Sequence, residues 1–204
     1  MRASGWLLPR VTDAKPTHLL LDGGKARVLD DSAGAFLNAY AIAVVKNVLP
    51  CVVELRTHVF KLFLDMDVKT TPEALLDFEA VMQVLQRRAA AFFDTDDPPR
   101  AVVCTTEPRE CGDHVKAGRH VVWTNVHVTA ATALAFRAAV VEDLEADMPE
   151  ACVKPWSVVV DACVFQANGL RMAYSGKGRG TSATYTPHQV WVGANSEIVA
   201  AARG

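Results

Sequence analysis

Residues 58–69, HVFKLFLDMDVK, repeat apolar and polar positions with a period of two. The even positions are all apolar, namely Phe60, Leu62, Leu64, Met66 and Val68. The odd positions include Lys61, Asp65, Asp67 and Lys69. This period predicts a β-strand that has one face in the core. Asp65 and Asp67 are then expected to project together from the opposite face.

A helical period appears in three other segments, residues 31–48, 70–93 and 129–148. Their expected N-cap residues are, in chain order, Asp31 or Ser32, Thr70 or Thr71, and Thr129. Leu75, Phe78, Met82 and Leu85 form the apolar stripe of the second helix. We interpret this stripe as core packing rather than as part of a ligand site.

Shorter apolar runs between these helices predict further strands. They lie at residues 17–31, 50–57, 100–106, 119–128, 156–165, 170–175 and 188–194. The first of these contains a turn at Gly23 and Gly24, and we expect it to be a hairpin. Residues 107–118 and 176–182 are predicted to be polar loops. Intermixed strands and helices with hairpins at both ends predict an α+β fold with a mixed sheet.

Composition limits the class of protein further. The chain has 204 residues, half of them hydrophobic, and a formal net charge of −2, which argues against a generally basic nucleic-acid binder. It has no run of eighteen apolar residues and no long apolar stretch near its N-terminus, so we expect no membrane span and no signal peptide. Five cysteines without a regular framework favour a reducing, intracellular compartment.

Carboxylates stand out where apolar runs end. Burying a charge is unfavourable unless the charge is paired or coordinates a metal. Asp65 and Asp67 follow one such run, and Asp161 follows the run SVVV. Two carboxylates on one strand face and a third from a neighbouring strand could hold hard divalent cations such as Mg²⁺.

Basic and histidine side chains follow these acids along the chain. His120 lies in KAGRHVVW, and Arg171 and Lys177 lie in LRMAYSGKGR, directly after the third acid. Such side chains could bind the phosphates of a nucleotide beside the metal ions.

Four motifs in a fixed order sharpen this picture. They are the acid-x-acid pair in LFLDMDVK (residues 62–69), the histidine segment KAGRHVVW (116–123), the apolar run ending in aspartate SVVVDACVF (157–165), and GLRMAYSGKG (169–178). In this order the chain resembles the catalytic domain of archaeo-eukaryotic primases, especially the primase-polymerases and the primase-helicases of large DNA viruses. The upstream segment CVVELRTHVFKLFLDMD (51–67) also resembles the viral relatives.

The resemblance implies a role for each matching residue. Asp65, Asp67 and Asp161 would be both the catalytic residues and the ligands of two Mg²⁺ or Mn²⁺ ions. The implied nucleotide-binding residues are Lys116, His120, Asn168, Arg171 and Lys177. One departure is Gly118, because relatives often carry a serine two residues before the histidine.

The resemblance also implies a fold and an activity. The fold would be two-lobed, with an N-terminal α/β lobe and an RRM-like lobe, and with the site in the cleft between them. We expect residues 1–204 to be one primase-polymerase catalytic domain, cut from a longer protein. It would join nucleoside triphosphates on a single-stranded DNA template during DNA replication, in the nucleus or a viral factory. A helicase, fused or separate, is the implied partner.

Several alternatives stay open at the level of sequence. The acids could be solvated strand ends, and His120 could be a hydrogen-bonded structural residue. Cys104, Cys111 and His114 have a C-x6-C-x2-H spacing, but we do not expect structural zinc because a fourth ligand is missing. The competing functions are a metal-dependent nuclease or replication-initiation endonuclease, and a non-catalytic nucleic-acid-binding module.

Overall fold

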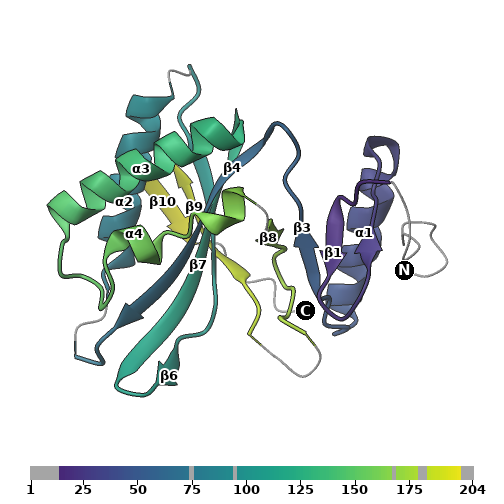
Figure 1. Cartoon of the computed structure of the whole chain (residues 1–204), viewed down its shortest axis with the longest axis horizontal. Coiled ribbons are helices and arrows are strands. Elements are labelled where there is room, and N and C mark those ends of the chain that lie inside the picture. The colour runs from purple at the N-terminus through teal and green to yellow at the C-terminus, as the bar shows by residue number, and fades with distance from the viewer. Residues whose placement is uncertain (1–13, 74–75, 94–95, 167–168, 179–182, 199–204) are drawn as a thin grey trace.

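The chain folds into two lobes of unequal size (Figure 1). The computed structural model describes residues 14–73, 76–93, 96–166, 169–178 and 183–198. Each lobe is built on an antiparallel sheet, and four helices complete the fold, which is therefore mixed α+β as expected. Within the described residues, no helix is both long enough and apolar enough to cross a membrane.

The smaller lobe has a four-stranded sheet and one long helix. Its sheet order is β2-β1-β3-β8. Its elements are β1 (His18–Leu20), β2 (Lys25–Ala26), the 3-10 helix η1 (Asp30–Ser32), α1 (Ala33–Val45), β3 (Val52–Glu54) and β8 (Leu170–Arg171). The predicted hairpin is confirmed, because β1 and β2 pair across a turn in which Gly23 and Gly24 have positive φ. Strand β8 comes from late in the chain and pairs antiparallel with β3, so the two ends of the lobe's sheet are far apart in sequence.

The larger lobe has a six-stranded sheet with its helices gathered on one side (Figure 1). The sheet order is β10-β9-β5-β7-β4, and β6 pairs with the first residues of β7. Its elements are β4 (Phe60–Thr70), α2 (Phe78–Phe92), β5 (Arg100–Thr105), β6 (Arg109–Cys111), β7 (His114–Val128), α3 (Ala130–Asp147), α4 (Trp156–Val159), the 3-10 helix η2 (Cys163–Phe165), β9 (Thr186–Val192) and β10 (Asn195–Ile198).

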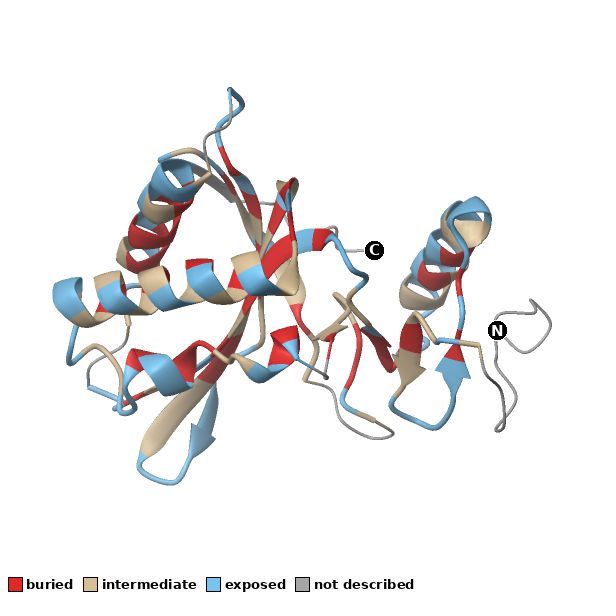
Figure 2. Ribbon diagram, turned by 45° about the horizontal axis from the view of Figure 1, so that its top comes forward, coloured by how far each residue is buried: buried red, intermediate tan, exposed pale blue. Residues whose placement is uncertain are grey.

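The core of the large lobe lies between this sheet and its helices (Figure 2). The alternation predicted for β4 is confirmed, because all five of its even-numbered residues from Phe60 to Val68 are buried. They pack with Met82 and Leu85 of α2 and Phe136 of α3. Burial of this face leaves Asp65 and Asp67 on the other side of the sheet, away from the helices.

The helix predictions are right in type and partly wrong in their starting points. Thr129 caps α3 as expected, because its hydroxyl accepts a hydrogen bond from the amide of Thr132. The second helix begins at Phe78 and not near Thr70, which is the buried last residue of β4. Its N-cap is Asp77, whose carboxylate accepts from the amides of Glu79 and Ala80.

One strand prediction and one loop prediction are wrong. Residues 156–165 form no strand but the short helices α4 and η2, joined by residues 160–162, of which Val160 makes an isolated bridge with Met66. Residues 107–118 are not a loop but a hairpin of β6 with the first part of β7. Residues 109–111 pair with the free edge of β7, and this pairing overrides their polar composition. Contacts with α3 hold the turn at Trp156, because Glu145 accepts a hydrogen bond from the amide of Trp156 and Arg137 donates to the carbonyl oxygens of Ser157 and Val160.

Candidate active site

The pairing of β4 with β7 places the predicted acids opposite the predicted histidine segment. Asp65 lies directly opposite His120, and Asp67 lies opposite Gly118. Side chains of directly opposed residues are about 5 Å apart and share one face of the sheet. The two motifs therefore meet because both are strands and because the register aligns them.

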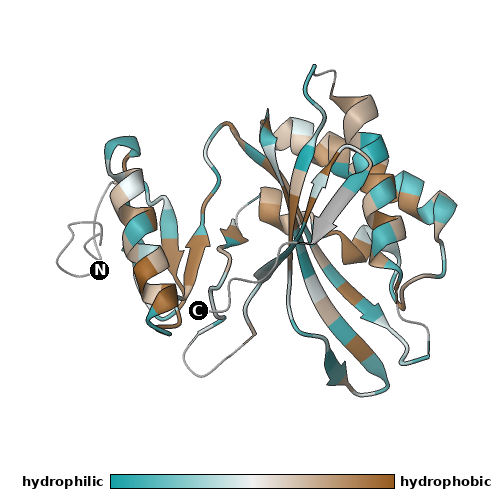
Figure 3. Cartoon of the chain, turned by 180° about the vertical axis from the view of Figure 1, so that it is seen from behind, coloured by the Kyte–Doolittle hydropathy of each residue, from teal (hydrophilic) through white to brown (hydrophobic). Residues whose placement is uncertain are grey.

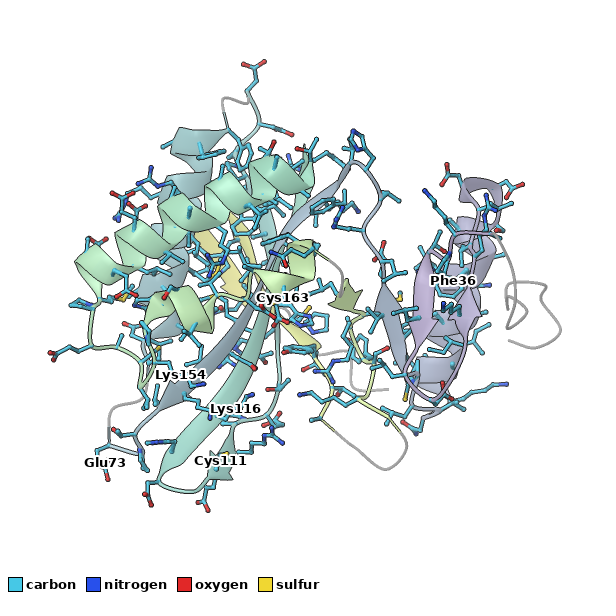
Figure 4. The ribbon with its side chains drawn as sticks, viewed as in Figure 1. Phe36, Glu73, Cys111, Lys116, Lys154 and Cys163 are labelled. Atoms are coloured by element: carbon cyan, nitrogen blue, oxygen red, sulfur yellow. The ribbon has the colours of Figure 1, made fainter. Side chains whose placement is uncertain are left out.

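Asp161 joins this group from the free edge of β4. Its backbone amide donates a hydrogen bond to the carbonyl oxygen of Asp65, at 2.9 Å. Its carboxylate accepts a hydrogen bond from the amide of Cys163, at 2.8 Å. Cys163 lies nearer the middle of the molecule than Lys116 of β7 (Figure 4). The third acid thus reaches the first by edge pairing, and the expectation that it ends a neighbouring strand is wrong.

The inner half of the site, Asp65 with His120, is withdrawn from solvent. The carboxylate of Asp65 lies 3.5 Å from Nε2 of His120, which is 3% exposed. Burial lowers the pKa of His120 to about 3, and Arg171 adds to this effect, so the imidazole is neutral at physiological pH. Burial also raises the pKa of Asp65 to about 6, with further contributions from Asp67 and Asp161.

The outer half of the site, Asp67 with Lys116, is an ion pair open to solvent. Nζ of Lys116 lies 2.8 Å from a carboxylate oxygen of Asp67. About half of the Asp67 side chain is exposed, against a quarter for Asp65. The ammonium group of Lys116 therefore occupies the position of a cation at this carboxylate.

Arg171, the last residue of β8, and Lys177, in the segment that follows β8, also lie at the site. Both lower the pKa of Asp65 through their charge. Together with Asp67 and Lys116 they line a small pocket beside β7. Asn168, which the resemblance also placed at the nucleotide, lies outside the described residues.

Tyr185 is a site residue that the sequence analysis missed. Its ring stacks on the imidazole of His120, with a centroid distance of 3.4 Å and an interplanar angle of 22°. The guanidinium of Arg171 lies over the ring of Tyr185, 4.5 Å from its centroid. Burial raises the pKa of Tyr185 well above its usual range, and the charge of Asp65 adds to the rise. The signal in the sequence was Gly118, which leaves room for this ring.

A cleft of about 500 Å³ lies next to this stack, between the lobes. Its lining includes Glu54 and Arg171 from the smaller lobe and Phe63 and His120 from the larger lobe. The acids, the basic side chains and the cleft therefore occupy one region of the molecule.

The donor set suits hard divalent cations, although the side chains need to rearrange to hold them. Carboxylate oxygens are the ligands that Mg²⁺ prefers, and the raised pKa of Asp65 indicates negative charge that is not fully compensated. Among the described residues, however, no three acidic, histidine or cysteine side chains are already arranged around a common point. Asp67 and Asp161 are engaged with Lys116 and Cys163, and both would have to turn toward an ion.

The cysteines considered for zinc are far apart. Cys104 pairs with His120, whereas Cys111 pairs with His114 at the other end of β7. Six residues of extended strand correspond to about 20 Å. Cys104 and His114 therefore cannot share one ion.

Three acids beside a cleft between two lobes, with lysine and arginine next to them, form a charged site on one side of the large sheet. Comparison with protein-family profiles matches residues 17–191 to the family described as the C962R protein N-terminal AEP domain, where AEP denotes the archaeo-eukaryotic primase superfamily. The chain belongs to this family. Membership indicates a nucleotidyltransferase of the primase-polymerase type. A search of curated protein sequences found no significant match.

Proposed function

We propose that this protein is a DNA-templated nucleotidyltransferase, a primase, a polymerase or both, that joins nucleoside triphosphates during DNA replication. One observation carries the proposal. Three carboxylates from two separate parts of the chain gather beside basic side chains. Asp65 and Asp67 come from β4 and Asp161 from the segment after α4, and Lys116, Arg171 and Lys177 lie beside them.

In the proposed reaction a 3′-hydroxyl attacks the α-phosphate of the incoming nucleotide, and pyrophosphate leaves. Asp65, Asp67 and Asp161 would hold two Mg²⁺ or Mn²⁺ ions. When bound, such ions lower the pKa of the attacking hydroxyl and neutralise charge on the phosphates. The carboxylates would orient these groups, and Asp65 is the less exposed of the two acids on β4.

The basic side chains have a separate part in the proposal. Arg171 and Lys177, beside the acids, would offset charge on the triphosphate as it develops. Lys116 would exchange Asp67 for a phosphate oxygen once a divalent ion takes the carboxylate. His120, as a neutral imidazole, would contact phosphate by a hydrogen bond rather than by charge.

The proposed partners are a single-stranded DNA template and a helicase, fused or separate. Contacts with the template phosphates would weaken as salt concentration rises. We place the protein inside the cell, at the site of DNA replication in a nucleus or a viral factory.

Incorporation of labelled nucleotides on a single-stranded template tests the proposal. We expect the wild type to extend or start strands in Mg²⁺ or Mn²⁺, and Asp161→Asn to lose this activity while keeping its fold. Asp22→Asn is the matched control, because Asp22 is an exposed acid in the β1–β2 turn. Normal incorporation by Asp161→Asn would refute the assignment. Cutting of the template without any need for triphosphate would favour a nuclease.

A further inference from the structure

Tyr185 occupies the space where residue 118 would otherwise carry a side chain. A Cβ atom placed on Gly118 would lie 2.5 Å from the hydroxyl oxygen of Tyr185 and 2.9 Å from Cζ. Such distances are far below van der Waals contact, and the ring of a buried tyrosine cannot give way easily. Only glycine at position 118 lets the phenol lie where it does.

Three contacts hold the phenol in this place. His120 stacks against the ring and Arg171 lies over it. The carbonyl oxygen of Tyr185 accepts a hydrogen bond from the amide of Tyr174, at 2.7 Å. Tyr185 is 4% exposed, so its orientation is determined by packing and not by solvent. The hydroxyl is therefore preorganised.

The site has two hollows, and Arg171 lines both of them. His120 lines the cleft between the lobes, whereas Tyr185 lines the small pocket beside Asp67 and Lys116. Four basic residues border this pocket, namely Arg109, Lys116, Arg171 and Lys177. Two acids, Asp67 and Glu107, border it as well. The pocket has a volume of about 20 Å³, which is room for one oxygen atom of a phosphate rather than for the whole group. The surrounding cations favour such an anionic oxygen, and a hydroxyl in the wall can donate to it.

We propose that the Tyr185 hydroxyl donates a hydrogen bond to a phosphate oxygen of the nucleoside triphosphate, and that Gly118 exists to admit this hydroxyl. The inference rests on the proposed function, since it names a contact of the same substrate. It assigns a substrate-contacting role to a residue outside the motifs that define the site. It also makes Gly118 a positioning residue, which acts only through Tyr185.

Two variants of Tyr185 separate the hydroxyl from the ring. Tyr185→Phe keeps the stack on His120 and removes only the donor, so we expect the KM for nucleotide to rise about tenfold at nearly unchanged kcat. Inorganic tripolyphosphate has phosphates but no sugar or base. Its affinity, measured by calorimetry in Mg²⁺, is expected to fall by a similar factor. An unchanged affinity for tripolyphosphate in Tyr185→Phe would overturn the proposal.

Gly118→Ala tests the steric part of the inference. The added methyl group displaces the phenol, so we expect weaker tripolyphosphate binding than in the wild type. Gly34→Ala is the matched control, because a Cβ atom at Gly34 meets nothing within 4 Å. In a Tyr185→Leu background, Gly118→Ala should have no further effect, since the partner it displaces is gone. A further loss in that background would show that Gly118 acts independently of Tyr185.

These measurements distinguish failure of the inference from failure of the proposed function. If the wild type incorporates nucleotides and Tyr185→Phe binds tripolyphosphate normally, only the inference is wrong. If the wild type binds tripolyphosphate through Tyr185 but never incorporates nucleotides, the contact stands and the polymerase assignment is wrong.

Discussion

Two halves of one site, built on the same pair of strands, have opposite physical character. In the inner half, Asp65 faces a buried and neutral His120, and burial raises its pKa, with contributions from Asp67 and Asp161. In the outer half, Asp67 is half exposed and already paired with Lys116. The two carboxylates lie two residues apart on β4, yet Asp67 has a direct ion pair with an ammonium group, whereas Asp65 faces a neutral imidazole.

The comparison suggests a division of work between the two halves. A divalent ion would offset the repulsion from Asp67 and Asp161 and the cost of burying the charge of Asp65. The inner half therefore gains most from binding the ion. At Asp67 the ion would have to displace Lys116, and the released ammonium would be free to bind a phosphate. Metal binding and nucleotide binding would then be coupled, because the ion that binds Asp67 would release Lys116 for a phosphate.

The largest expected effect is on activity, and it is shared by both halves. Asp65→Asn and Asp67→Asn should each reduce nucleotide incorporation by at least about 1000-fold, or about 4 kcal/mol in transition-state stabilisation. Incorporation by the purified variants, with circular dichroism to confirm their fold, checks this. More than one hundredth of wild-type activity in either variant would remove that carboxylate from the proposed metal site.

Substitutions in the two halves should differ in their effect on the free energy of unfolding, although the two acids have similar effects on activity. His120→Ala leaves a cavity beneath the ring of Tyr185, and we expect the free energy of unfolding to fall by about 3 kcal/mol. Lys116→Ala removes a partly exposed ion pair and should cost less than about 1 kcal/mol. Urea unfolding measures both, and His188→Ala at an exposed position of β9 is the control. Equal losses in the two variants would contradict the contrast between the halves.

The sequence was sufficient for the parts of the fold in which local pattern and burial agree. The alternation in β4, the periodicity of α1 and α3 and the Thr129 cap all follow from residues near one another in the chain. The sequence also singled out Asp65, Asp67 and Asp161, because each follows an apolar run, and their role as metal ligands stays a prediction. What failed was the conformation before Asp161, where hydrogen bonds from Arg137 of α3 hold a helical turn despite the β-propensity of three valines.

Other features depend on contacts that no local pattern reports. Tyr185 reaches His120 from a different strand, and only the absence of a side chain at Gly118 hints at it. The smaller lobe is a further example. Its buried cluster is only Val28, Phe36, Tyr40 and Val52, and α1 carries apolar residues on several sides (Figure 3). Periodicity predicted this helix, but it did not predict that Leu37, Ile42 and Val45 would be exposed.

The part of the pH dependence of stability that Asp65→Asn removes should report on the inner half. Without metal, the folded protein holds the proton of Asp65 more tightly than the unfolded chain does, because burial raises the pKa from its usual value near 3.8 to about 6. As the pH rises from about 4 to about 6, the unfolded chain releases this proton first, so the free energy of unfolding falls. Above about pH 6 the loss is complete, at about 2 kcal/mol once the partial exposure of Asp65 is considered.

Urea unfolding of the wild type and of Asp65→Asn in EDTA, at several pH values, checks this expectation. The difference between the two proteins should grow over that interval and stay constant at higher pH. Addition of Mg²⁺ at pH 7 should recover part of the lost stability in the wild type only. A difference that does not change between pH 4 and pH 7 would show that Asp65 is not under the strain that its surroundings imply.

The smallest effect is expected from Lys116→Gln, which tests the exchange of ion pairs in the outer half. The free energy of unfolding should change by no more than about 0.5 kcal/mol, because exposed ion pairs contribute little. The KM for nucleotide should rise about threefold to tenfold if the ammonium moves to a phosphate, and this rise should shrink at high salt. Lys46→Gln, at the exposed end of α1, is the matched control. If the KM stays at the wild-type value while metal binding tightens, Lys116 only competes with the ion at Asp67 and never reaches the triphosphate.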